Sequence, residues 1–485
     1  MPKSQLRTEF GDFQTPADLA QNVCESLLQA GVSPASILEP TCGRGSFLLA
    51  AARAFTSVQK MAGVEINPQY SKYAEHLLNQ LGTDIPFEIV TADIFSFPWE
   101  PFIKRLPQPL LIVGNLPWVT NTELGTLDSQ NLPQKSNFQN HRGIDAITGK
   151  GNFDISEYML LRATDWLNNT SGTLAMLCKT AVARKVLLES WKKRLRIKRA
   201  DIYLVDASAH FGAVVASCLL VVDFSPNATS SECYLHADLS TPANSTFGLH
   251  GDRLVADLAT YTRWEHLDGG KRGTWRSGIK HDCSKVMQLV CEGSKYRNGL
   301  GSLVDLEDEY LYPMLKSSDL ANNVSPQPRY YMLVPQRFIG EQTANIRHDA
   351  PHTWKYLVEH GEFLDQRSSS IYRKRPRFSV FGIGDYSFAP WKITIAGLCK
   401  TLKFRLVGPF HGRPVVLDDT CYLYSCESEK EARVVLEMVN SPAANQFLSS
   451  LIFWDNKRPV TAELLNRLDL FQLAKELGRL DDLAD

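Results

Sequence analysis

The feature that most constrains this chain is a series of short apolar segments, each ending at an acidic or amide side chain. These side chains are Glu39, Glu65, Asp93 and Asn115, and we expect a helical crossover between successive segments. Short apolar runs bounded by Gly and Pro are typical of buried parallel strands. In a doubly wound sheet the carboxyl ends of such strands form the edge that binds ligands. The series therefore predicts an α/β domain with a polar site at that edge.

A glycine turn follows the first segment. In Glu39-Pro-Thr-Cys-Gly-Arg-Gly45 a Gly-x-Gly turn leads into an alanine-rich helix from 48 to 55. Glycine lets the backbone approach a ligand closely, and a helix N-terminus offers N–H groups to a carboxylate. This is not the dinucleotide fingerprint, because Leu48 occupies the third glycine position. Since Glu39 would repel a pyrophosphate, we expect a cationic ligand such as a sulfonium amino acid.

The next two acids predict a nucleoside site. Glu65 lies one βαβ unit downstream, where an acidic residue commonly binds ribose hydroxyls. We expect Asp93 to bind the adenine amino group, and Ile66 and Ile94 to sandwich the ring. Together these residues describe a site for an adenosine that carries an amino-acid tail.

The fourth segment, 110–113, runs into the loop Asn115-Leu-Pro-Trp118. This loop offers a carboxamide acceptor, the backbone carbonyl of Leu116, a stiff turn at Pro117 and the indole face of Trp118. Such groups are appropriate for a flat heterocycle that carries an amino group. The alternative interpretation is a strand ending in a turn with a core tryptophan.

In their order, these motifs resemble those of the gamma-class (TaqI-type) S-adenosylmethionine-dependent DNA adenine-N6 methyltransferases of restriction–modification systems. The resemblance implies a doubly wound, Rossmann-like class I methyltransferase domain, S-adenosyl-L-methionine as the cofactor and double-stranded DNA as the substrate. The cofactor-binding residues would be Phe13, Thr15, Pro16, Glu39, Thr41, Cys42, Gly43, Gly45, Glu65, Ile66, Asp93, Ile94 and Asn115. The catalytic residues would be Asn115, Leu116, Pro117 and Trp118. Read in isolation, Thr15 and Pro16 would simply cap and begin a helix.

The catalytic tetrapeptide departs from the family pattern at one position. The family has Asn, Asp or Ser followed by two prolines and an aromatic residue, whereas this chain has Leu116 at the first proline. The family uses the backbone carbonyl at that position, which leucine also provides, so we expect activity. A further aromatic residue of the family stacks on the extruded base, and Phe211 is matched to it. The alternative for Phe211 is a core phenylalanine.

Two basic segments predict contact with the DNA backbone. The segment from 179 to 199 holds nine Lys or Arg residues against one acid, and a second basic patch lies between 367 and 377. A solvated helix face is the usual meaning of such a run, but beside a base-binding site phosphate contact is favoured. The residues assigned to this contact are Lys179, Arg184, Lys185, Arg373, Lys374 and Arg375.

The chain of 485 residues is too long for a single core. A stretch rich in Ser, Thr, Asn and Pro after residue 225 predicts a boundary. We expect a catalytic domain at 1–225, a linker at 226–250 and a mixed α+β target-recognition domain, which sets DNA specificity, at 251–485. We also expect the polar loop from 120 to 150 to close over the substrate base; the alternative is a surface insert.

Composition excludes several other classes of protein. Hydrophobic residues make up 44% of the chain and charged residues 22%, with a net charge of −1, as in an ordinary globular protein. No apolar run reaches membrane-spanning length, and the N-terminus lacks a signal-peptide core. Ten scattered cysteines without a Cys-x-x-Cys pair indicate buried thiols in a reducing cytoplasm. We expect no metal site, because the cysteine spacings do not fit one.

The sequence therefore predicts a site-specific, adenine-specific DNA methyltransferase that modifies adenine N6 after base flipping, in a restriction–modification or phage-defence system. The alternatives are the same chemistry on cytosine N4, RNA or a protein glutamine, and a catalytically silent DNA-recognition subunit. We expect any restriction endonuclease to be a separate chain, because Thr15 already belongs to the first motif.

Overall fold

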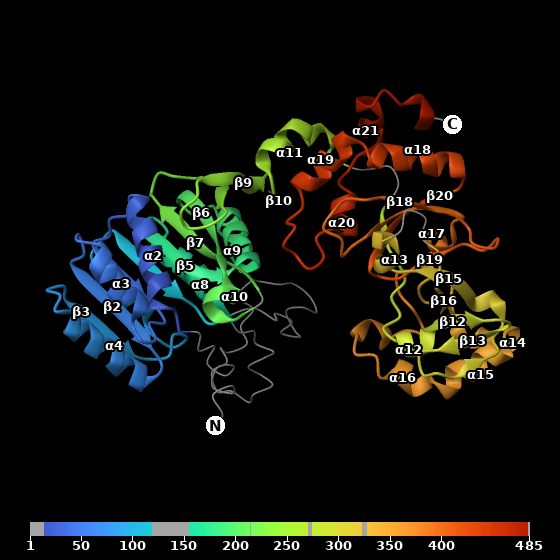
Figure 1. The fold of residues 1–485 in the computed structure, drawn as a ribbon, viewed down its shortest axis with the longest axis horizontal. Helices are drawn as coiled ribbons and strands as arrows, with labels where there is room; N and C mark the ends of the chain where they lie inside the picture. Colours follow the sequence, from blue (N-terminus) through green and yellow to red (C-terminus); the bar gives the residue numbers. More distant parts are fainter. Residues whose placement is uncertain (1–13, 119–154, 214, 270–273, 323–326, 484–485) are drawn as a thin grey trace. The chain divides into compact units, whose positions relative to one another are not determined.

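The computed structural model describes residues 14–118, 155–213, 215–269, 274–322 and 327–483 (Figure 1). The chain forms two compact units, Met1–Leu258 and Ala259–Asp485. Among the described residues, no helix has the length and apolar character needed to cross a membrane. Phe13 and the loop from 120 to 150, both assigned above, lie outside the described residues.

A ten-stranded sheet in the order β10-β9-β8-β6-β7-β5-β4-β1-β2-β3 forms the centre of the first unit. Neighbouring strands from β3 across to β5 pair in parallel, and β7 is antiparallel to both β5 and β6. The strands are β1 (Ser36–Glu39), β2 (Lys60–Glu65), β3 (Phe87–Thr91), β4 (Leu110–Asn115), β5 (Thr173–Lys179), β6 (Ile197–Asp206), β7 (Ala216–Phe224), β8 (Glu232–His236), β9 (Ala243–His250) and β10 (Arg253–Val255).

Both faces of the parallel part of this sheet are buried. The helices are α2 (Ala17–Gln29), α3 (Ser46–Ala54), α4 (Pro68–Leu81), α5 (Trp99–Ile103), α8 (Ile155–Leu167), α9 (Thr180–Lys192) and α10 (Ala207–Phe211). Apolar residues of α2 and α3 share one core with Ala175 and Leu177 of β5. The alternate β5 residues Leu174 and Met176 are equally buried, and both α8 and α9 contact this strand. Since successive side chains of a strand point to opposite faces, the sheet is doubly wound, and the predicted fold class is confirmed.

The stretch 226–250, predicted to be a linker, instead extends the sheet. It contains β8, which pairs in parallel with β6, and β9, which pairs antiparallel with β8. Cys233 and Phe247 are buried, although most of their neighbours are polar. The polar composition was misleading because strands at the side of a sheet can leave one face in water. The first unit accordingly ends at Leu258 and not at 225.

The second unit combines helices with two sheets, of four strands (β11-β20-β17-β18) and six strands (β14-β13-β12-β16-β15-β19). Its strands are β11 (Arg276–Ser277), β12 (Gln288–Glu292), β13 (Lys295–Asn298), β14 (Leu303–Val304), β15 (Leu311–Leu315), β16 (Tyr330–Leu333), β17 (Trp391–Ala396), β18 (Arg405–Val407), β19 (Val416–Leu417) and β20 (Cys421–Cys426). Its helices are α11 (Leu258–Trp264), which begins at the boundary, α12 (Ser284–Met287), α13 (Ser317–Asn322), α14 (Ile346–Asp349), α15 (Pro351–Glu359), α16 (Gly361–Asp365), α17 (Asp385–Phe388), α18 (Glu429–Val439), α19 (Pro442–Ser450), α20 (Ala462–Leu465) and α21 (Leu470–Glu476). This is the predicted mixed α+β organisation.

A buried lysine makes the stability of the second unit depend on pH. Lys392 of β17 is 1% exposed, and its ammonium donates to the carbonyl of Ala389. Burial lowers the pKa of Lys392 from its ordinary value of 10.5 to about 7. Between these two values the unfolded chain binds a proton that the folded chain does not, so the free energy of unfolding rises with pH across this window.

We therefore expect Lys392→Met to stabilise the second unit below pH 7, by up to about 1.4 kcal/mol per unit of pKa shift. The gain should shrink as the pH approaches 10.5, where the cost of burying the charge disappears from the wild type. Urea unfolding of the full chain, followed by tryptophan fluorescence at a series of pH values, measures both effects. A methionine variant that is less stable than the wild type at neutral pH would contradict this account.

Candidate functional site

The polar side chains predicted from the sequence meet at one edge of the sheet. β1, β2 and β4 end at Glu39, Glu65 and Asn115, and Asp93 follows β3 by two residues. These strands are parallel neighbours, so their carboxyl ends lie together. The chain order reverses between β1 and β4, which is the switch point where open α/β sheets bind ligands.

The glycine turn after β1 depends on backbone conformations that favour glycine. Gly43 and Gly45 have φ values of 50° and 84°. A Cβ on Gly45 would lie 3.1 Å from the Cβ of Ala74 in α4. The carboxylate of Glu65 holds this turn, because its two oxygens accept the backbone N–H groups of Gly43 at 2.9 Å and Asn67 at 2.8 Å. The turn is thus closely packed and fixed to the end of β2.

Glu39 is a buried carboxyl, and one of its oxygens can still accept a hydrogen bond from a ligand. It is 3% exposed, and its Oε2 has no hydrogen-bond partner among the described residues. Burial raises the pKa of Glu39 well above its ordinary range; the Leu48 N–H opposes this and the negative charge of Glu65 adds to it. Burial without a countercharge favours the neutral form of a carboxyl, whereas a cation beside it would favour the ionised form.

The end of β3 forms a turn with apolar side chains around it. Asp93 Oδ1 accepts the backbone N–H of Phe95 at 2.9 Å, and the carbonyl of Ile94 accepts the indole N–H of Trp99 at 2.8 Å. Ile66, which follows β2, is 39% exposed. An apolar side chain left in water beside two strand-end acids is consistent with contact to a ring.

The segment before α2 differs from the sequence expectation by one residue. Pro16 and not Thr15 occupies the N-cap position, and it makes no side-chain capping bond. The carbonyl of Thr15 instead accepts the hydroxyl of Ser46 at 2.9 Å, which ties this segment to the first residue of α3. Gln14, which the sequence analysis missed, accepts the N–H of Arg44 through Oε1 at 3.3 Å. In the sequence, only its position next to Thr15 and Pro16 could have indicated that Gln14 belongs to the site.

Two side chains hold the loop 115–118, one from the turn after β1 and one from the last residue of β5. The hydroxyl of Thr41 donates to the carbonyl of Asn115 at 3.3 Å, and the ammonium of Lys179 donates to the carbonyl of Trp118 at 3.1 Å. Leu116 is 3% exposed, so its side chain packs inward. The ring of Trp118 meets that of Phe211 edge to face, with centroids 5.3 Å apart. The structure thus brings Asn115, Trp118 and Phe211 to one place.

In the basic segment from 179 to 199, the three residues that were expected to contact phosphates are bonded to other parts of the protein or buried. Lys179 bonds the loop 115–118, and Arg184 is only 8% exposed. Arg184 lies on the same side of α9 as the buried Thr180 and Leu187, a helical spacing already visible in the sequence. Lys185 forms an ion pair with Glu157 at 3.2 Å. In this structure Arg184 is thus largely covered by its neighbours, and its contact with the DNA backbone stays a prediction. Arg373, Lys374 and Arg375, in the second unit, are exposed.

This sheet order, with a glycine turn after β1 and acids at successive strand ends, defines a class I methyltransferase. Residues 3–207 of the chain match the N-6 DNA methylase family. Over 475 residues the chain is 46% identical to the type II methyltransferase M.NspV of a Nostoc species, which covers 97% of this chain and 98% of the relative. The chain therefore belongs to the N-6 DNA methylases of type II restriction–modification systems.

Two further matches are more distant. The type II methyltransferase M.CvrRI of Paramecium bursaria Chlorella virus XZ-6E is 30% identical over 114 residues, 24% of this chain and 26% of that protein. The structure of the type IIL restriction-modification enzyme MmeI in complex with DNA matches with a TM-score of 0.50 at 12% identity. That match covers 98% of this chain and 77% of MmeI, so the likeness in fold extends beyond the catalytic unit.

S-adenosylmethionine is the methyl donor of this family, and the residues at the edge of the sheet fit it. The unpartnered oxygen of Glu39 can accept a cationic amino group, and the turn at Gly43 and Gly45 presents backbone without a Cβ to a ligand. No group of three or more His, Cys, Asp or Glu side chains that could hold a metal ion occurs within the described residues.

Proposed function

We propose that this protein transfers a methyl group from S-adenosyl-L-methionine to adenine N6 in duplex DNA at a specific site. It would act in the cytoplasm as the modification enzyme of a restriction–modification system, beside a separately encoded endonuclease. The observation that supports this proposal is the loop 115–118 at the switch point, where Asn115 ends β4 and the ring of Trp118 meets that of Phe211 edge to face.

The chain's own groups would make the adenine amine reactive. The N6 lone pair is delocalised into the ring, so the amine is a poor nucleophile. The side-chain oxygen of Asn115 and the carbonyl of Leu116 would accept the two N6 hydrogens and localise the lone pair on nitrogen. The bound cofactor supplies an electrophilic methyl group on a sulfonium. The lone pair held on N6 by Asn115 and Leu116 would take up this methyl group as the S–CH₃ bond breaks, and N6 would then lose a proton to solvent. Positioning and electrostatics provide most of the acceleration.

Two aromatic rings would hold the target outside the helix. In duplex DNA the adenine must leave the base stack, which costs a few kcal/mol. Stacking on an aromatic side chain contributes ~1–3 kcal/mol per base and offsets part of that cost. Trp118, which is 8% exposed, and Phe211, whose ring meets it edge to face, are the proposed stacking residues.

The proposed cofactor contacts follow the strand ends. Glu39 would bind the cationic tail, Glu65 the ribose hydroxyls and Asp93 the adenine amino group. Glu65 already accepts two backbone N–H bonds, but a carboxylate has about four acceptor positions, so it can accept hydroxyls as well. The other residues assigned to this site are Phe13, Thr15, Pro16, Thr41, Cys42, Gly43, Gly45, Ile66 and Ile94.

Incubation with labelled S-adenosylmethionine tests this function, with duplex DNA, RNA of the same sequence and a protein mixture offered separately. Nucleoside analysis of the DNA digest should show N6-methyladenine. N4-methylcytosine, or label only in RNA or protein, would overturn the assignment of the substrate. Absence of transfer together with absence of cofactor binding would favour a silent DNA-recognition subunit.

Lys179 provides a prediction within the same site. Because its ammonium donates to the carbonyl of Trp118, we expect Lys179→Met to loosen the loop 115–118 and lower kcat about tenfold. The KM for DNA and the salt dependence of DNA binding should stay near those of the wild type. A phosphate contact would instead reduce the salt slope by about 1 with little change in kcat.

Lys192→Gln is the matched control for this variant, since Lys192 lies in the adjoining helix α9 and pairs with Glu189 at 3.7 Å. Its kcat should remain that of the wild type. Single-turnover methylation and DNA binding at several salt concentrations separate the two roles of Lys179. An unchanged kcat with a smaller salt slope would show that Lys179 contacts DNA.

A further inference from the structure

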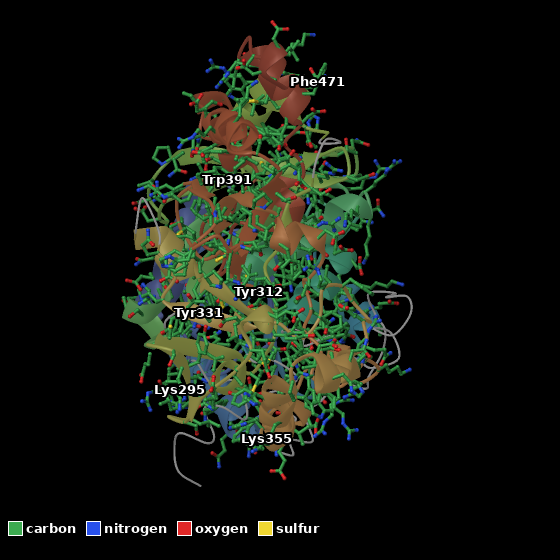
Figure 2. All side chains as sticks on the ribbon, turned by 90° about the vertical axis from the view of Figure 1, so that its right-hand side faces the viewer. Lys295, Tyr312, Tyr331, Lys355, Trp391 and Phe471 are labelled. Atoms are coloured by element: carbon green, nitrogen blue, oxygen red, sulfur yellow. The ribbon has the colours of Figure 1, made fainter. Side chains whose placement is uncertain are left out.

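Four side chains of the second unit form a continuous stack of cations and rings. The guanidinium carbon of Arg337 lies 4.5 Å from the ring centroid of Phe388. The rings of Phe388 and Tyr312 are 5.0 Å apart, and the guanidinium carbon of Arg413 lies 5.4 Å from the Tyr312 ring. The members come from β15, α17 and two separate loops. Figure 2 labels Tyr312 on the face of the second unit that is turned to the viewer.

Neither guanidinium group of this stack is paired with a carboxylate of the described residues, so both can bind an anionic partner. Arg337 and Arg413 form hydrogen bonds through their backbones. By contrast, Arg297, Arg377 and Arg433 of the same unit each pair with a carboxylate. A guanidinium seated on a ring is preorganised and still presents donors in a fork that matches phosphate oxygens.

An apolar tip directly follows the first arginine of the stack. Phe338 is 59% exposed and Ile339 is 45% exposed. The tip is held in place, because the buried Gln336 donates to the carbonyl of Phe338 at 3.0 Å and accepts the N–H of Val380 at 3.0 Å. Two adjacent, fixed apolar side chains in water indicate a contact that the isolated protein does not satisfy.

The surroundings of the tip favour an anionic partner. A Cβ on Gly340 would lie 3.6 Å from a guanidinium nitrogen of Arg375, so a third arginine adjoins the turn. Glu341, the acid of this turn, accepts the backbone N–H of Arg337. Positive groups around an apolar tip match the chemistry of a DNA groove, which offers phosphates at its rim and apolar base surface within.

We propose that the stack of Arg337, Phe388, Tyr312 and Arg413, together with the tip at Phe338 and Ile339, forms a contact surface for duplex DNA. The two arginines bind phosphates on the rim of a groove, and the tip enters the groove and contacts the bases. This inference rests on the proposed function, because it assumes that duplex DNA is the substrate. It adds residues outside the basic patch between 367 and 377.

The arginines and the tip have different expected signatures in DNA binding. Arg337→Gln combined with Arg413→Gln should weaken binding to the methylated target duplex about tenfold for each arginine. The salt slope should fall by about 0.9 for each lost phosphate contact. Phe338→Ser should also weaken binding about tenfold, but with an unchanged salt slope, since an apolar contact releases no counterion. Fluorescence anisotropy of the full-length variants at several salt concentrations measures both quantities.

Matched controls lie elsewhere on the same unit. Phe471→Ser removes an apolar side chain that is 47% exposed on α21, and Arg433→Gln removes an arginine already paired with Glu429. Figure 2 labels Phe471 well away from Tyr312. Neither control should change the affinity or the salt slope.

The outcomes separate this inference from the proposed function. If the wild type methylates DNA but the double arginine variant and Phe338→Ser bind like the wild type, the surface is overturned and the function stands. If the wild type neither binds nor methylates DNA, the proposed function itself fails. Thermal unfolding and cofactor binding of each variant show whether it still folds. If the double variant does not fold, the single variant Arg337→Gln replaces it, because Arg337 is exposed.

Discussion

Replacing Asn115 with alanine should remove nearly all methyl transfer and leave the affinity for S-adenosylmethionine within a few-fold of the wild type. The carboxamide oxygen is the proposed acceptor of an N6 hydrogen, and loss of one such preorganised group typically costs about 10²–10³ in rate. The loop itself should survive the change, because Thr41 bonds the backbone carbonyl of Asn115, which alanine retains. Single-turnover methylation at saturating cofactor and DNA, together with calorimetry, measures the two effects.

Asn115→Asp is the matched variant, since it keeps an acceptor oxygen at the same position. It should retain more activity than Asn115→Ala, although its charge alters the site. An alanine variant that loses cofactor binding would show that Asn115 acts mainly on the cofactor. An alanine variant with nearly full rate would remove Asn115 from the mechanism.

Replacing Glu39 with glutamine should weaken cofactor binding about 10- to 100-fold, as expected for the loss of a charge-assisted hydrogen bond. In the unliganded protein, burial raises the pKa of Glu39 well above its ordinary range, so the carboxyl is protonated at a higher pH than usual. A cationic ligand favours the ionised carboxylate. Binding should therefore release a proton, and the wild-type affinity should rise with pH until the raised pKa is passed.

Glutamine carries no ionisable proton, so the Glu39→Gln variant should lose this part of the pH dependence. Calorimetry in buffers of different ionisation enthalpy counts the released proton directly. The control is Glu88→Gln in β3, because Glu88 is a partly exposed carboxylate paired with Lys60 and such pairs contribute little. Wild-type binding without proton release would argue against Glu39 as the partner of the cationic group.

The site at the sheet edge was readable from the sequence because each of its parts is local. A strand, the acid that ends it and the glycine turn that follows are contiguous, and parallel strands bring their carboxyl ends to the same edge. The positions of Glu39, Glu65, Asp93 and Asn115 therefore needed no knowledge of distant contacts. The same is true of Gly43 and Gly45, whose positive φ values suit the residue that occupies them.

The tertiary structure alone decided the partners of side chains that are far apart in the chain. A basic run predicted phosphate contact, but strand pairing placed Lys179 beside the loop 115–118, and packing buried Arg184. The polar stretch 226–250 became two strands because β6 offered an open edge.

The meeting of Trp118 with Phe211, and the stack that joins Arg337 to Arg413, likewise depend on how separate segments pack. Local pattern determines where strands, turns and strand-end acids lie, because those features arise within a few residues. Which side chains then touch is set by strand order and core packing, and no short stretch of sequence carries that information.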